Sequence, residues 1–149
     1  MDASTEPFEL LRELFSRQRL GVLTTHGPEY PYASLEAVRA DDDLRHLYFS
    51  TTRATRRFQF LSAEPQVAML VDSRADDDLD FHGAVAATAV GAARELAGDE
   101  RAAQFAAFLT RHPHLRPFAG APTSALVELE VDTYFIVSRF QNVTELHMR

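Results

Sequence analysis

Hydroxyl and guanidinium side chains are concentrated in one short stretch of the chain. Residues 50–57 read STTRATRR, between a predicted strand and a predicted helix. Hydroxyls, guanidinium forks and the free N–H groups of a first helical turn are together typical of a site for a phosphate dianion. The stretch therefore predicts a phosphate-binding site. The alternative is that Thr55 only caps a helix whose arginines are solvated.

The residues that the chain lacks narrow the chemistry further. No glycine-rich loop accompanies residues 50–57, so neither a dinucleotide fingerprint nor a Walker motif is present. The chain contains no Cys, which excludes disulfides, thiolate metal sites and cysteine nucleophiles, and redox chemistry would need a bound cofactor. All 15 basic residues are Arg, which excludes a Schiff-base lysine.

Length and charge predict one globular domain over residues 1–149. The formal net charge of −7 argues against a nucleic-acid partner, because phosphate neutralisation needs a basic face. No apolar run has the length of a membrane span, and the first residues lack the basic-then-apolar order of a signal peptide. We expect no membrane partner and a cytoplasmic location.

The elements that must position residues 50–57 are mostly strands. Apolar residues recur at helical spacing over residues 7–18, with Pro7 suited to a first turn. Alternating segments and turn residues then predict a three-strand meander, followed by a short helix and a buried strand. These segments are residues 20–25, 31–38 and 44–50 for the meander, 55–61 for the helix and 66–72 for the strand.

The second half of the chain continues this pattern after an acidic loop over residues 76–80. An Ala-rich helix could compete over residues 80–96, but we expect a long strand from Asp80 to about Leu96 with bulges at Gly83 and Gly91. The segment contains three β-branched residues, and the two glycines weaken a helix. Beyond it we expect a helix over 99–111, an irregular segment to Pro122, and strands over 124–138 and 142–148. These elements predict a small, mainly β, antiparallel barrel with peripheral helices.

The order and spacing of several motifs resemble the pyridoxamine 5′-phosphate oxidase-like, FMN-binding split-barrel family. The motifs are LGVLTT at 20–25, PYASLE at 31–36, LYFSTTRATRR at 47–57 and EPQVAML at 64–70. The resemblance implies a six- to seven-stranded antiparallel split β-barrel with two or three helices. It also implies FMN as cofactor and a homodimer with the flavin at the interface.

The resemblance also implies roles for individual residues. One strand would lie along the isoalloxazine ring, and the end of another strand, with the residues after it, would hold the phosphate and ribityl groups. Arg57 stands where many members have Lys, which keeps the positive charge but changes the hydrogen-bond geometry. The ring residues would be Ala33, Ser34, Leu35 and Glu36, and the phosphate and ribityl residues would be Ser50, Thr51, Thr52, Thr55, Arg56 and Arg57.

The resemblance weakens after Gly83. The C-terminal residues lack the basic and aromatic substrate-binding side chains of the vitamin B6 oxidase, and the chain has no Trp. Oxidation of pyridoxamine phosphate is therefore not expected. The prediction is an FMN-dependent oxidoreductase acting on a small substrate, with no residue assigned to acid–base catalysis. The alternatives are a non-catalytic flavin- or haem-binding protein for storage, electron transfer or sensing, and a deazaflavin-dependent reductase.

Other combinations of residues predict no site. His112 and His114 flank a proline and diverge, and the acidic loop lacks the glycine and distal glutamate of a calcium loop. Ser34, Glu36 and His46 have the residue types of a hydrolase triad, but no nucleophile elbow surrounds the serine. We therefore expect neither a metal site nor a hydrolase.

Overall fold

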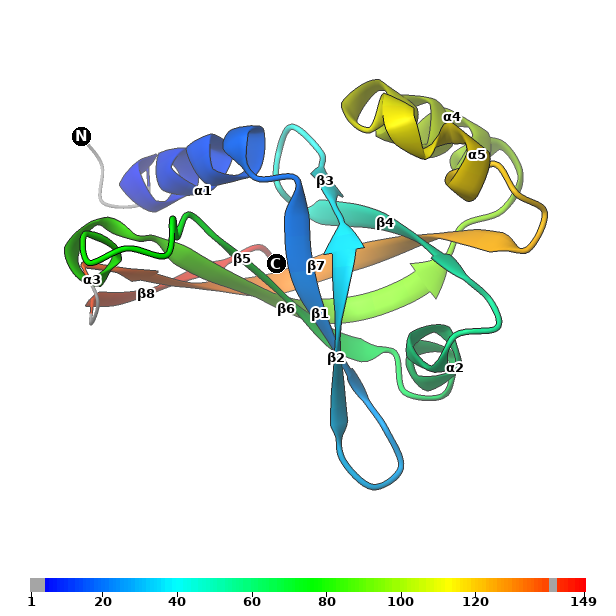
Figure 1. Ribbon diagram of the computed structural model, residues 1–149, viewed down its shortest axis with the longest axis horizontal. Coiled ribbons are helices and arrows are strands. Elements are labelled where there is room, and N and C mark those ends of the chain that lie inside the picture. The colour runs from blue at the N-terminus through cyan, green and yellow to red at the C-terminus, as the bar shows by residue number, and fades with distance from the viewer. Residues whose placement is uncertain (1–4, 140–141) are drawn as a thin grey trace.

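One antiparallel sheet organises the protein. The structure is a computed structural model that describes residues 5–139 and 142–149. The sheet is curled into a half-barrel, as Figure 1 shows, and its strands follow the order β2-β1-β5-β6-β7-β4-β3, with β8 beside β7. The strands are β1 Leu20–His26, β2 Pro31–Ala37, β3 Arg39–Ala40, β4 His46–Thr52, β5 Gln66–Asp72, β6 Ala86–Glu95, β7 Ser124–Ser138 and β8 Asn142–His147.

The predicted split barrel is confirmed, but the predicted three-strand meander is wrong. Strands β1 and β2 form a hairpin, whereas β4 pairs with β7 from His46↔Glu130 to Thr52↔Ser124. The chain leaves β2 at Val38, whose N–H donates to Arg19 O, and then pairs the two-residue β3 with β4. All residues of β4 pair with the long strand β7, on the opposite side of the sheet from the β1–β2 hairpin.

The helices pack on both sides of the sheet. They are α1 Thr5–Arg17, α2 Arg56–Ala63, α3 Asp80–Gly83, α4 Gly98–Arg111 and α5 Arg116–Ala119, with a 3-10 turn at Pro113–Leu115. In Figure 1, α1 lies along one side of the curled sheet and α4 and α5 are grouped near β4. No helix in the described part of the chain is long and apolar enough to cross a membrane.

The predicted strand over residues 80–96 begins later than expected. Its first residues form the one-turn helix α3, because the Asp80 carboxylate accepts hydrogen bonds from the N–H groups of Ala75, Asp76 and Asp77 at 2.7–3.2 Å. Gly83 therefore ends a helix and is not a bulge. The bulge predicted at Gly91 is confirmed by a register shift between Val90 and Gly91. The segment before Pro122, predicted as irregular, contains the 3-10 turn and α5.

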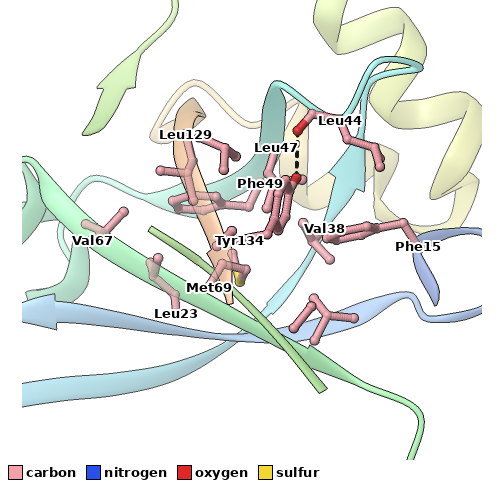
Figure 2. Packing of buried hydrophobic residues seen from close by; sticks show 14 of the residues in the cluster. Phe15, Leu23, Val38, Leu44, Leu47, Phe49, Val67, Met69, Leu129 and Tyr134 are labelled. Atoms are coloured by element: carbon pink, nitrogen blue, oxygen red, sulfur yellow. Dashed lines mark hydrogen bonds between the residues drawn. The ribbon is translucent and has the colours of Figure 1, made fainter. Parts of the chain in front are cut away.

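The main core lies between α1 and the inner face of the sheet. Figure 2 shows Phe15 from α1 beside Val38, and the ring of Phe15 packs edge-to-face against Tyr134 of β7 with centroids 6.1 Å apart. The Tyr134 hydroxyl is buried and donates to Leu44 O at 2.7 Å, the dashed line in Figure 2. Leu44 has a φ of 63°, so this bond holds a backbone conformation that a leucine rarely adopts.

Candidate functional site

The hydroxyl- and arginine-rich stretch lies where β4 ends and α2 begins. Thr55 is the N-cap of α2, and its Oγ1 accepts a hydrogen bond from Phe58 N at 3.3 Å. The same hydroxyl donates to Thr52 O at 2.8 Å and lies 3.2 Å from Thr51 Oγ1. Threonine at this position satisfies one donor of the first turn and fixes where the helix starts. The capping expected of Thr55 is therefore present, and the arginines decide whether the stretch does more.

Arg57 joins three secondary-structure elements. Its Nε lies 2.7 Å from Thr51 Oγ1 on β4 and 2.6 Å from Glu36 Oε1 on β2, so it lies between the two strands and α2. The Ser34 hydroxyl donates to the same Glu36 oxygen at 3.1 Å. Five residues that the sequence places in the site, from β2, β4 and α2, thus form one connected network: Ser34, Glu36, Thr51, Thr55 and Arg57.

Glu36 is the buried charged member of this network. Its side chain is 3% exposed and that of Arg57 is 23% exposed. Burial raises the pKa of the Glu36 carboxyl above its ordinary value of 4.5, although the charge of Arg57 and the hydrogen bonds from Ser34 and Arg57 act in the opposite direction. Within the network, Glu36 cancels the charge of the guanidinium that it contacts.

The other two arginines of the stretch differ from each other. Arg53 forms a two-pronged ion pair with Glu95, with Nη2 2.6 Å and Nε 3.1 Å from Oε2, and it also donates to Pro122 O. Arg56 is exposed and has no hydrogen-bond or ion-pair partner among residues 5–139 and 142–149. The N–H groups of Arg56 and Arg57 also donate to no described residue. An anion at the start of α2 would meet one uncompensated guanidinium and two free amides.

The remaining predicted residues lie around this network or away from it. Along β2, the side chains of Ala33 and Leu35 are exposed and point to the face opposite Ser34 and Glu36. The carbonyl oxygen of Thr52 accepts a hydrogen bond from the Thr55 hydroxyl. Ser50 is on the face of β4 opposite Thr51, and its Oγ is buried without a hydrogen-bond partner in the described residues. Ser50 is therefore not part of the network.

The ion pair between Glu36 and Arg57 is the feature of the candidate site that the sequence does not predict. The family resemblance predicts both residues in the site, one beside the flavin ring and one at the phosphate. Their contact depends on the packing of α2 against β1 and β2, seen in the edge-to-face contact of Tyr32 with Phe60 at 5.8 Å. Residue type and spacing carry no signal for that packing.

The residues that have the types of a hydrolase triad or of a metal site form hydrogen bonds with other partners. Ser34 contacts Glu36, whereas His46 Nδ1 lies 2.7 Å from Asp41 Oδ2, so Ser34, Glu36 and His46 form no triad. The ring of His112 is bonded to Val38 O. Asp41, Asp43 and His46 bring ligand atoms within 4.8 Å of one another, but the bond between Asp41 and His46 accounts for that arrangement.

The sequence pattern of the pyridoxamine 5′-phosphate oxidase family matches residues 8–138, which is most of the chain. No curated protein matches the chain. The family match spans both the β4–α2 stretch and the closing strand β7. It agrees with the motifs from which the family resemblance was inferred.

Solved structures share the fold at low sequence identity. A heme-binding protein from Mycobacterium smegmatis is 18% identical with a TM-score of 0.81, and the match covers 91% of this chain and 55% of that protein, so this chain spans about half its length. General Stress Protein 26 from Bacillus anthracis is 18% identical (TM-score 0.73, covering 96% and 99%). An FAD-binding protein from Mesorhizobium loti is 15% identical (TM-score 0.70, covering 86% and 90%). At these identities the likeness shows the fold alone.

Proposed function

Because this chain belongs to the pyridoxamine 5′-phosphate oxidase family, we propose that it is an FMN-binding flavoprotein, an oxidoreductase acting on a small substrate. The flavin would supply the hydride or electron transfer, because the chain has no Cys to carry redox chemistry itself. The protein would supply binding, orientation and electrostatics. No described side chain is assigned to acid–base catalysis.

The observation that carries this proposal is the unpaired cation at the start of α2. Arg56 and the N–H groups of Arg56 and Arg57 have no partner in the described residues, at a helix N-terminus that already favours negative charge. A phosphate monoester matches this donor set, since it offers several acceptor oxygens and up to two negative charges. Thr51, Thr52 and Thr55 supply hydroxyl and backbone groups beside it.

The flavin ring would lie along β2, beside Ala33, Ser34, Leu35 and Glu36. Strand β2 is at the edge of the sheet and its only ladder partner among the described strands is β1. A planar aromatic ring can therefore approach β2 from the open side. The ion pair between Arg57 and Glu36 connects β2, the strand beside the proposed flavin ring, to the proposed phosphate site at the start of α2.

A homodimer would cover the exposed side of this site. The outer face of the sheet carries a row of side chains in register, Leu35, Val22, Leu70, Thr88 and Phe135, and Leu35 is 64% exposed. The row is apolar except for one threonine and is continuous with the proposed ring strand. A second copy of the chain would bury this row and close the site over the flavin.

A haem-binding protein is the second candidate. The observation in its favour is the similarity in fold to the heme-binding protein from Mycobacterium smegmatis. A non-catalytic carrier of flavin or haem, or a protein that holds a deazaflavin, would keep the same fold. The identity of the bound chromophore distinguishes these candidates.

The test begins with the absorbance spectrum of the purified protein and the mass of the released chromophore. We expect a flavin spectrum and the mass of FMN, and tighter binding of FMN than of riboflavin in fluorescence titrations. Anaerobic addition of NADH or NADPH then separates an enzyme, whose flavin is reduced and reoxidised, from a passive carrier. A Soret band and released haem would favour the second candidate, and equal affinity for FMN and riboflavin would remove the reason for the phosphate assignment.

A further inference from the structure

The unpaired charge at the β4–α2 junction balances only one of the two negative charges of a phosphate dianion. Of the three arginines in the stretch, Arg53 is paired with Glu95 and Arg57 with Glu36, and Arg56 is the one without a partner in the described residues. The Glu95 side chain is 33% exposed, so solvent screens that pair. The Glu36 side chain is 3% exposed, and its charge therefore acts at nearly full strength on anything bound beside Arg57.

We propose that Glu36 is a specificity-determining residue of the phosphate site, which withholds Arg57 from the ligand so that a phosphate dianion binds together with one proton taken up by the Glu36 carboxylate. The inference rests on the proposed function. The proton comes from solvent and forms an O–H bond on a Glu36 oxygen. The Arg57 guanidinium then exchanges its contact with Glu36 for one with the phosphate.

The balance of charge is the physical reason. With Glu36 ionised and a dianion bound, two guanidinium groups face three negative charges in a partly desolvated site. Once Glu36 is protonated, two positive charges face two negative charges. A like charge close to a buried carboxylate favours its protonated form, so the phosphate itself promotes the uptake. Burial acts in the same direction on the pKa of Glu36 before any ligand binds.

The groups around Glu36 leave Arg57 as its main electrostatic partner. From β2 the Ser34 hydroxyl donates to it, and from α2 the Arg57 guanidinium contacts it. Thr51, on β4, reaches it only through Arg57. On β1 the residue opposite Glu36 is Gly21, which carries no charge. Arg57 is thus the one charged group that acts on Glu36 among the described residues.

The experiment measures FMN and riboflavin affinities by flavin fluorescence between about pH 6.5 and 8.5, where free phosphate monoesters are mostly dianionic. In the parent protein the ratio of FMN to riboflavin affinity should fall with rising pH, by up to about tenfold per pH unit. Calorimetry in two buffers of different ionisation enthalpy should show uptake of up to about one proton per FMN and none with riboflavin.

Glu36→Gln keeps the shape and the hydrogen bonds of the side chain and removes its charge. At pH 8 this variant should bind FMN roughly tenfold or more tightly than the parent, since a freed Arg57 adds a charge-assisted hydrogen bond. The ratio of FMN to riboflavin affinity, which cancels any effect on the flavin ring, should therefore rise by about the same factor, and its proton uptake should disappear. Glu95→Gln is the matched control: Arg53 stays bonded to Pro122 O, so affinities and proton uptake should stay at parent values.

Two results overturn the inference alone: a parent protein that binds FMN in preference to riboflavin without taking up a proton, or a Glu36→Gln variant whose ratio of FMN to riboflavin affinity at pH 8 is no higher than that of the parent. A parent protein that binds neither flavin overturns the proposed function and the inference with it. Proton uptake is measured on the parent, so it decides the question even if the variant does not fold.

Discussion

The Nε2 atom of His112 lies 2.9 Å from the carbonyl oxygen of Val38, and both residues are buried. A carbonyl can only accept, so this nitrogen carries the proton of the neutral ring. The bond joins the end of α4 to the connection between β2 and β3. The ring also contacts Phe108, with centroids 4.9 Å apart.

His112 should make the stability of the protein depend on pH. Burial lowers its pKa below the ordinary value of 6.5. Because the folded-state pKa is depressed, the folded state binds fewer protons than the unfolded state, and the stabilisation present above pH 6.5 is lost as the pH falls through that value. We expect urea unfolding to show a larger drop in stability between pH 7.5 and 5.5 for the parent than for His112→Gln. The variant itself should lose about 1–3 kcal/mol at pH 7.5. Parallel pH dependences would contradict this assignment.

The loss of Arg56 should be seen in FMN affinity, and the loss of Arg57 should also be seen in the stability of the fold. Arg56→Ala removes the uncompensated cation and should reduce FMN affinity by roughly 10- to 150-fold while leaving riboflavin affinity unchanged. Arg57→Ala leaves the Glu36 carboxylate buried without its partner and should lower the free energy of unfolding by about 1–3 kcal/mol, as measured with urea. Arg53→Ala is the control, since Arg53 is committed to Glu95, and its FMN affinity should match the parent. Retained discrimination between FMN and riboflavin in Arg56→Ala would show that Arg56 is not the phosphate ligand.

Gly91 should tolerate no side chain. A Cβ at this position would lie 1.9 Å from the carbonyl oxygen of Glu130 on the neighbouring strand, so the backbone of the bulge would have to move. We expect Gly91→Ala to lower the free energy of unfolding by about 3 kcal/mol or more. Gly83→Ala, where nothing lies within 4 Å of the added atom, should change it by less than about 0.5 kcal/mol. Equal effects of the two substitutions in thermal or urea unfolding would exclude the close approach as the cause.

Leu35 should be a central residue of the proposed dimer. Light scattering should give the parent protein a mass of two 16.7 kDa chains. Leu35→Glu places a charge in the apolar row and should give a single chain, with weaker FMN binding because the site is no longer covered. Leu79→Glu is the control, since Leu79 is 76% exposed in the acidic loop and lies outside the row. A parent that is monomeric at micromolar concentration would count against the dimer.

Local patterns in the sequence predicted most of the elements. The apolar run over residues 66–72 and the alternation over 124–138 predicted β5 and β7 with the bounds that the structure has, and the N-cap Thr55 marked the start of α2. The error at Asp80 has a local cause, because one carboxylate that binds three backbone N–H groups stabilises a turn where β-propensity indicated a strand. The partner of β4 could not be predicted, because strand pairing depends on contacts between distant segments.

In the candidate site, too, local sequence predicted one part and contacts between distant segments determine the other. The residues of the phosphate stretch are adjacent in sequence, and their types alone indicated an anion. Whether each guanidinium is paired depends on residues distant in the sequence. Glu95 pairs with Arg53 and Glu36 pairs with Arg57, whereas no described residue pairs with Arg56. Residue type indicates which side chains can bind an anion, whereas tertiary packing decides which of them are free to do so.

Strand β7 determines when this protein can complete its fold during synthesis. It pairs with β6, β4 and β8, and it follows β4 by about 70 residues in the chain. When the first two thirds of the chain have left the ribosome, β4 has no ladder partner except the two-residue β3. The backbone edge of β4, the strand that leads into the phosphate stretch, stays open to solvent and to other chains until β7 emerges. We therefore expect a C-terminal truncation before Ser124 to aggregate and to leave no flavin-binding fragment.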